Sequence, residues 1–154
     1  MQLSKKEWGN SVWIFFHVIA DRINEDKFNT IKADVINVTK LICSHLPCPE
    51  CSEHASKILK NINLEKVINS KDDLIKFYFN FHNHINKKLN KPQYNEAKLY
   101  SDYTSYDIKI CIENINKIFI YKPIIPALMT KNFHKQLAHP RFKQLVNNII
   151  NSFI

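Results

Sequence analysis

Glycine is almost absent from this chain of 154 residues, in which Gly9 is the single example. Loops that cradle phosphate groups with backbone N–H groups need several glycines. Neither a P-loop nor the Gly-x-Gly-x-x-Gly turn of dinucleotide-binding folds can therefore form here. The alternation of apolar and polar residues that marks strands is also weak throughout, and the sequence has no internal repeat. If the chain binds a nucleotide, other groups must hold it.

Long hydrophobic runs are missing as well. No stretch of about 20 apolar residues is present, so we expect no membrane-spanning helix. The first six residues lead into a charged amphipathic segment, and we therefore expect no signal peptide. These absences favour a soluble protein of the cytosol. In that compartment a Cys-x-x-Cys pair is more often redox-active or metal-binding than a structural disulfide.

The composition indicates one folded domain with a substantial core. Of the residues, 45% are hydrophobic, and there are ten Phe, six Tyr and two Trp. The formal charge of +8 is compatible with nucleic acid, an acidic surface or an anionic cofactor as partner. The basic residues are scattered, except for the cluster of Lys87, Lys88 and Lys91.

Apolar residues recur at three- and four-residue steps along most of the chain, which predicts an all-α fold. The first helix should begin at Ser4, because Ser4 and Glu7 form a capping box. The other helices are expected over residues 29–45, 49–61, 71–89, a short segment around 94–103, 106–120, and from His139-Pro140 to Phe153. The helix over 71–89 is apolar around most of its surface, so we expect it to be the most buried.

The most informative stretch is Leu-Pro-Cys-Pro-Glu-Cys at residues 46–51. Pro49 suits the first turn of a helix, which would put Cys48 at the helix cap and Cys51 one turn later. Backbone N–H groups at a helix start stabilise a thiolate, so this pair should exchange disulfides readily. The spacing taken alone also fits half of a zinc site or two inert buried thiols.

Polar side chains interrupt two apolar helices. His17 lies one turn from Trp13, where the pair could line a flat aromatic ligand or where His17 could simply bond a nearby carbonyl group. His82, Asn83 and Asn86 share one side of the helix over 71–89. An unpaired buried polar group costs about 1–3 kcal/mol, so these groups must bond one another, the backbone or a ligand. The lysine cluster at the end of that helix would suit phosphate groups.

Three patterns that occur in order resemble the Erv/ALR family of FAD-linked sulfhydryl oxidases. The first is Gly-x-x-x-Trp-x-x-x-His-x-x-Ala, which begins at Gly9 and ends at Ala20. The second is Pro-Cys-x-x-Cys at residues 47–51. The third is His-Asn-x-Ile-Asn at residues 82–86, followed by Leu-x-Lys-Pro-x-Tyr at residues 89–94. The form of the cysteine motif is similar to that of short members encoded by large cytoplasmic DNA viruses.

The resemblance covers roughly residues 5–103 and implies a fold, a cofactor and a reaction. The implied fold is a four-helix bundle with a short fifth helix, which usually forms a homodimer. Cys48 and Cys51 are the implied catalytic residues. The implied FAD contacts are Gly9, Trp13, His17, His82, Asn83, Asn86, Lys87, Lys88, Lys91, Tyr94 and Tyr103. We expect residues 1–103 to form the oxidase domain and residues 104–154 to form a helical extension, of unknown role, on the same domain.

The implied reaction forms disulfide bonds in substrate proteins. A substrate thiolate attacks Cys48, electrons pass through Cys51 to FAD, and dioxygen accepts them to give hydrogen peroxide. The expected substrate is a small thioredoxin-like dithiol carrier. The expected setting is a viral disulfide-forming pathway in virion assembly, in the host cytoplasm with the virion as a second location. No nucleic-acid partner is expected.

The chain departs from the family in several places. A structural disulfide of cellular members would join the positions held here by Phe79 and Glu96, so it is missing. Tyr103 stands where the family has a Trp that packs by the adenine. No second Cys-x-x-Cys follows in a tail. The two remaining cysteines, Cys43 and Cys111, are expected to be ordinary buried thiols.

Two alternatives remain open. A zinc module could use Cys43, Cys48 and Cys51 with His54 or His45 as the fourth ligand. A basic nucleic-acid-binding protein would bind oligonucleotides in a salt-sensitive way. Both alternatives leave the Trp13/His17 and His82/Asn83/Asn86 patterns unexplained.

Overall fold

The computed structural model describes residues 4–95, 103–121 and 129–153, and all structural statements concern these residues. Their regular elements are helical, which confirms the predicted all-α fold. The helices are α1 (Lys5–Arg22), η1 (Glu25–Lys27), α2 (Phe28–Cys43), α3 (Pro49–Lys60), α4 (Leu64–Val67), α5 (Lys71–Lys88), α7 (Ile108–Ile120) and α8 (Met129–Ile150). None of these described helices has the length and apolar character needed to cross a membrane.

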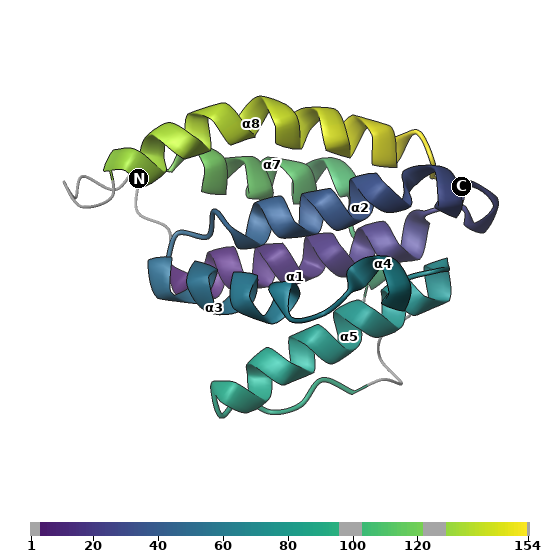
Figure 1. Cartoon of the computed structure of the whole chain (residues 1–154), viewed down its shortest axis with the longest axis horizontal. Coiled ribbons are helices and arrows are strands. Elements are labelled where there is room, and N and C mark those ends of the chain that lie inside the picture. The colour runs from purple at the N-terminus through teal and green to yellow at the C-terminus, as the bar shows by residue number, and fades with distance from the viewer. Residues whose placement is uncertain (1–3, 96–102, 122–128, 154) are drawn as a thin grey trace.

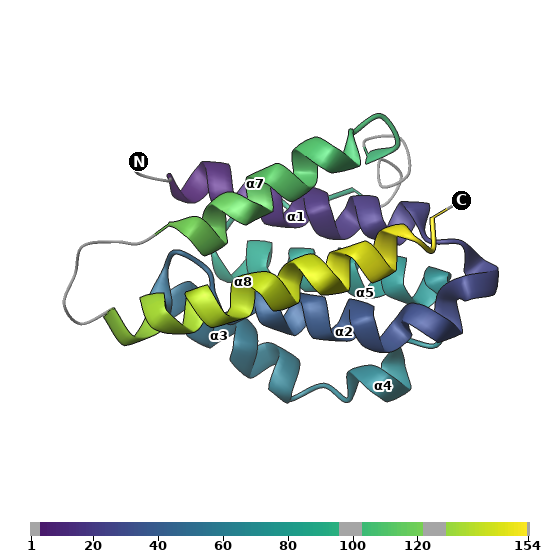
Figure 2. The same ribbon diagram turned by 90° about the horizontal axis from the view of Figure 1, so that it is seen from above.

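The helices lie in three layers (Figure 1). Helices α7 and α8 form one outer layer, α1 and α2 form the middle, and α3, α4 and α5 lie on the opposite side. The view from above shows α7 over α1 (Figure 2). Among the described residues, the most extensive contacts between helices join α2 to α8 and α1 to α7. The middle layer is therefore covered from both sides.

Helix α1 is the most deeply buried element. Residues 15–20 are all buried, and six consecutive residues point in every direction around a helix. The expectation that the helix over 71–89 would be the most buried is wrong. Helix α5 packs on α1 at the edge of the molecule, and Leu89 just beyond its end is 46% exposed. Helix α1 is more buried because α5 covers one face and α7 covers another.

Two of the predicted helix starts are confirmed by their caps. Ser4 caps α1 in a complete capping box with Glu7. Ser70 caps α5, because its hydroxyl accepts a hydrogen bond from the backbone N–H of Asp73 at 3.1 Å. The short α4, which begins after a cap by Asn63, was not expected. Most of the short helix expected over 94–103 falls on residues 96–102, outside the described residues.

The last helix begins ten residues before the expected start. Pro140 lies inside α8 instead of opening it, so this boundary was predicted wrongly. The turn before the proline is held by tertiary contacts: the His139 ring stacks on Phe119 at 5.7 Å, and its Nε2 lies 3.0 Å from Oδ1 of Asn116. Pro140 itself is exposed, so the backbone carbonyl that loses its N–H partner faces solvent.

Replacement of Pro140 by Ala should stabilise the protein. The change restores one backbone hydrogen bond and removes the ring from an exposed helix interior, where proline is about 3 kcal/mol worse than alanine in unconstrained helices. We expect a gain of about 1–3 kcal/mol in the free energy of unfolding, measured by urea denaturation. Lys143→Ala, one turn later on the exposed side, is the matched control and should change it by less than about 0.5 kcal/mol. Equal effects of the two substitutions would contradict the expectation.

Candidate active site

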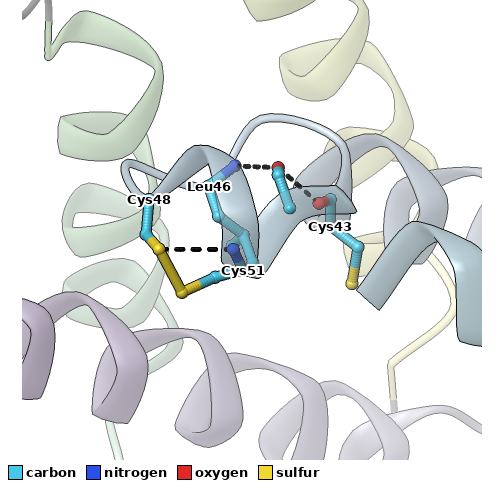
Figure 3. Close-up of a disulfide and its surroundings, with 5 residues drawn as sticks. Cys43, Leu46, Cys48 and Cys51 are labelled. Carbon is cyan, nitrogen blue, oxygen red and sulfur yellow. Dashed lines mark hydrogen bonds between the residues drawn. A yellow bond between two sulfur atoms is a disulfide. The ribbon is translucent and has the colours of Figure 1, made fainter. Parts of the chain in front are cut away.

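The two cysteines of the Cys-x-x-Cys motif stand at the start of α3. Cys48 is the N-cap residue and Pro49 occupies the first helical position, as the sequence predicts. The sulfur of Cys48 accepts a hydrogen bond from the backbone N–H of Cys51 at 3.2 Å (Figure 3). The two residues are joined by a disulfide with Cα atoms 5.2 Å apart. When this bond is reduced, the helix N-terminus is placed to stabilise negative charge on Cys48.

A buried serine, which the sequence analysis missed, fixes the turn that carries the pair. The hydroxyl of Ser52 donates to the backbone carbonyl of Cys43 at 2.7 Å and accepts from the N–H of Leu46 at 3.0 Å (Figure 3). These bonds tie the start of α3 to the end of α2. The disulfide is therefore attached to a braced turn and not to a free loop.

A cavity of about 320 Å³ opens beside Cys51. Its walls come from the start of α1, from α3 and from the second half of α5. The sequence-predicted residues that line it are Gly9, Trp13, Cys51, His82, Asn86 and Lys91. A Cβ added at Gly9 would meet nothing within 4 Å, so the glycine leaves open space beside the cavity. Cys48 does not line the cavity, so the two sulfurs of the disulfide have different surroundings.

Aromatic rings form one wall of this cavity. The Trp13 and His82 rings are stacked with centroids 4.2 Å apart and planes 10° apart. A second hollow of about 380 Å³ is also lined by Trp13 and His82, together with Asn10, Ile14, Tyr103 and Tyr106. The two rings are thus a shared wall between two spaces, which suits a ligand with more than one flat part.

His17 lies behind this wall and is 4% exposed. Its Nε2 atom lies 3.2 Å from Nδ1 of His82, and its ring stacks on Tyr103 at 4.6 Å. Burial, with a smaller contribution from His82, lowers the pKa of His17 to about 3. Burial, followed by the nearby Lys91, lowers the pKa of His82 to about 4. Both rings are therefore neutral near pH 7, and one proton lies between them.

Unlike His82 and Asn86, which line the cavity, Asn83 forms hydrogen bonds with the protein backbone. Its Oδ1 accepts from the backbone N–H of Tyr94 at 2.6 Å, and its Nδ2 donates to the carbonyl of Tyr94 at 3.2 Å. Asn90 has φ 55°, a left-handed conformation that Asn tolerates, and it turns the chain at the end of the helix. Asn83 thus holds the segment after the helix against α5, while Lys91 of that segment reaches the cavity.

The predicted lysines divide into two groups. Lys91 lines the cavity, whereas Lys87 and Lys88 do not. The ammonium group of Lys88 instead donates to Nε2 of His54 at 2.7 Å. Burial, and then the charge of Lys88, lowers the pKa of His54, a cavity residue one turn after Cys51. Lys5 and Lys6 also line the cavity; the sequence analysis missed them because their position depends on how α1 packs.

The remaining cysteines are buried thiols, as expected. Cys43 lines the cavity, and burial raises the pKa of its thiol to about 12. Within the described ranges, no three His, Cys, Asp or Glu side chains are close enough to hold a metal ion. The zinc alternative, which needs four such ligands around Cys48 and Cys51, therefore gains no support.

Comparison with known proteins gives a consistent set of relatives. The profile of the Erv1 / Alr family matches residues 10–104. A protein of Invertebrate iridescent virus 3, named as an FAD-linked sulfhydryl oxidase, is 35% identical over 103 residues, which are 67% of this chain and 70% of that protein. The FAD-linked sulfhydryl oxidase ERV1 of Arabidopsis thaliana is 26% identical over 89 residues, 58% of this chain and 46% of that protein.

A shorter relative comes from vaccinia virus, strain Copenhagen, and is also named as an FAD-linked sulfhydryl oxidase. It is 28% identical over 92 residues, which are 60% of this chain and 90% of the relative. No solved structure matches the chain at a significant level. All three patterns of the resemblance, from Gly9 to Tyr94, lie within or at the edge of the family match.

Removal of the Ser52 hydroxyl should loosen the turn that carries the redox pair. Ser52→Ala leaves the carbonyl of Cys43 and the N–H of Leu46 without this partner, so we expect a loss of about 1–3 kcal/mol in the free energy of unfolding. Ser56→Ala, one turn later on the same helix, is the control and should have a smaller effect. Urea denaturation of the two variants tests this, and equal losses would show that the bridge has no special role.

The neutral histidine pair predicts acid sensitivity. The pKa of each ring is about 6.5 in the unfolded chain and about 3 (His17) or 4 (His82) in the folded protein. The free energy of unfolding is therefore highest above about pH 6.5 and falls as the pH drops towards 4. In that range the unfolded chain binds a proton at each ring, whereas the folded protein does not. The slope is at most about 1.4 kcal/mol per pH unit for each ring.

Urea denaturation at several values between pH 7.5 and pH 4.5 measures this slope. His17→Phe should make the dependence shallower, whereas His84→Gln, at an exposed position of α5, should leave it unchanged. Identical slopes for the two variants would remove the buried pair as the cause.

Proposed function

The chain belongs to the Erv1/Alr family, and from that premise we propose that it is an FAD-linked sulfhydryl oxidase that forms disulfide bonds in protein substrates. One observation supports the proposal above the others: Cys51 of the disulfide lines the same cavity as the stacked rings of Trp13 and His82. A dithiol pair beside a cavity with a flat aromatic wall is what transfer of electrons from cysteine to a planar cofactor requires.

The residues around the cavity fit FAD. The neutral rings of Trp13 and His82 offer flat apolar surfaces, and Asn86 offers an amide group for hydrogen bonds to a ring edge or to hydroxyl groups. Lys5, Lys6 and Lys91 offer positive charge for the phosphates of the cofactor. The second hollow, beyond the shared wall, gives room for another part of an extended dinucleotide.

The predicted contacts divide accordingly. We propose that Gly9, Trp13, His82, Asn86 and Lys91 contact the cofactor directly. His17, Asn83 and Tyr94 are better explained as residues that support these, because they bond or stack within the protein. Tyr103 lines the second hollow and can do both. For Lys87 and Lys88 the support is weaker, since neither lines the cavity.

The protein's own part in the reaction is disulfide exchange at Cys48. A substrate thiolate attacks the sulfur of Cys48, the Cys48–Cys51 bond breaks, and Cys51 leaves as a thiolate beside the cavity. A second substrate thiolate then attacks the substrate sulfur of the mixed disulfide. The substrate leaves as a disulfide, and Cys48 leaves as a thiolate that the N–H of Cys51 stabilises.

Bound FAD supplies the two-electron acceptor that returns the cysteine pair to the disulfide and delivers the electrons to dioxygen as hydrogen peroxide. Burial keeps Cys43 a neutral thiol next to the pair, so it does not compete as a nucleophile.

The substrate and the setting are further proposals. We propose a small thioredoxin-like dithiol protein as substrate, because Cys48 stands at a helix start where another protein's thiol can reach it. Because several relatives are viral proteins, we also propose that the chain acts in a viral disulfide-forming pathway of virion assembly, in the host cytoplasm or the virion. We also propose residues 1–103 as the oxidase domain, with residues 104–154 folded onto it.

A substitution of Cys51 tests the assignment. Cys51→Ser should lower thiol oxidation by roughly 10³-fold or more, because the residue takes part in the covalent step. The variant should still bind FAD, which the visible absorption of the purified protein reports. Cys111→Ala removes a buried cysteine that lies outside the cavity and should keep normal turnover. Oxygen consumption with dithiothreitol as substrate measures the rates.

Two results would contradict the proposal. Normal turnover by Cys51→Ser would show that another group carries the electrons. A purified protein that is colourless and cannot be reconstituted with FAD would remove the cofactor, and a zinc assay would then test the remaining use of the cysteines.

A further inference from the structure

The covering of α1 and α2 comes largely from helices outside the family match. The match ends at residue 104, whereas α7 begins at Ile108 and α8 at Met129. These two helices nevertheless make the most extensive contacts with the middle layer, α7 with α1 and α8 with α2. The extension therefore completes the core and is not an appendage to it (Figure 1).

Helix α8 contributes a continuous buried stripe. Its buried residues recur at three- and four-residue steps, which is the pattern of a helix that covers a core. They are Lys135, Ala138, Phe142, Leu145, Val146 and Ile149. Phe142 is 0% exposed, and its ring lies 6.0 Å from Phe15 of α1 and 4.9 Å from Phe119 of α7. One side chain of α8 thus joins three helices.

Helix α7 has the same character. Ile115 and Ile118 are 0% exposed and Phe119 is 1% exposed. The Phe119 ring also lies 5.8 Å from His45, which follows the end of α2 and precedes the redox motif. Helix α7 therefore reaches the end of the molecule that carries the disulfide, where Phe119 packs against the turn between α2 and α3.

The far end of the extension is fastened to the turn between α1 and α2. The backbone N–H of Asn24 donates to the carbonyl of Ser152 at 2.8 Å. Ile23 and Phe153 pair in an isolated antiparallel bridge, and Ser152 is 2% exposed. Contacts thus run along the whole length of the middle layer, from the redox end to the opposite turn (Figure 2).

Without α7 and α8, the middle layer would present a large apolar face to water. Contiguous apolar patches of more than a few hundred Å² are rare on monomeric proteins and usually mark a surface that binds a partner. A protein that assembles from identical subunits most often covers such a face with a second copy of itself. The vaccinia virus relative is matched over 90% of its length, so its unmatched part is shorter than the 22 residues of α8.

We infer that α7 and α8 cover, within one chain, the face of α1 and α2 through which a family member without them would self-associate, and that this protein is a monomer. This differs from the homodimer that the family resemblance predicts. It assigns a role to α7 and α8: they replace a second copy in the core, while Cys48, Cys51 and the cavity stay on other surfaces of α1, α3 and α5.

Sedimentation equilibrium of the full chain loaded with FAD tests the inference directly. We expect one species with the mass of a single chain, 18.2 kDa plus the cofactor, independent of protein concentration from micromolar to the highest soluble concentration. A species of twice that mass would overturn the inference, whether it forms through another face or by exchange of α8 between two copies.

Two point variants test the cause. Phe142→Ala removes the side chain that joins α8 to α1 and α7, so the average mass should rise with concentration as the apolar face becomes accessible. Gln144→Ala, at an exposed position of the same helix, should stay monomeric. If Phe142→Ala does not fold, the milder Val146→Ala takes its place. A folded core variant that stays monomeric at the highest concentration would contradict the role assigned to the extension.

The test of the monomeric state is independent of the proposed function. A dimeric wild-type protein that oxidises thiols would overturn this inference alone, and a monomer without thiol oxidase activity would overturn the proposed function alone.

Discussion

The burial of α1 from both sides is the constraint on which the rest of the structure depends. Its outer face is held by α7 and its inner face by α5, so the helix has no freedom to rotate. The same helix carries Trp13 on the cavity wall and His17 one turn later, bonded to His82 of α5. A shift of α1 would therefore move the aromatic wall and break the contact between the two histidines. The core and the candidate site are parts of a single packing arrangement.

The aromatic wall of the cavity is neutral, and the charged groups lie at the cavity's rim. The groups at the flat wall are neutral, because burial lowers the pKa of His17 and of His82 far below 7. The positive groups stand at the rim: Lys5 and Lys6 reach the cavity from the start of α1, and Lys91 reaches it from the segment after α5. A buried cation would be costly, whereas a cation at the rim keeps its contact with water. The cavity can thus accept a flat neutral ring and hold charged phosphates at its edge.

Local rules predicted much of the fold and of the site, and tertiary packing decided what they missed. Pro49 is enough to place Cys48 at a helix cap, and helical spacing is enough to put His82 and Asn86 on one side of α5. The partner of Asn83 could not be predicted, because it is the backbone of residue 94 and not a side-chain pattern. Ser52 was missed because serine in a first helical turn has many uses. The early start of α8 depends on contacts of His139 with Phe119 and Asn116, which override the local preference of proline.

The position of α8 in the chain also has a consequence for synthesis on the ribosome. Domains fold as the chain emerges, beginning from the N-terminal part. The redox motif and helices α1, α3 and α5, which line the cavity, leave the ribosome while α8 is still being translated. The apolar face of the middle layer, which includes Phe15, therefore stays exposed to water until Phe142 of α8 packs on it. During that interval the nascent chain already exposes the thiols of Cys48 and Cys51 together with the apolar face of α1 and α2. Until α8 has packed on α2, this apolar face is therefore open to association with another chain.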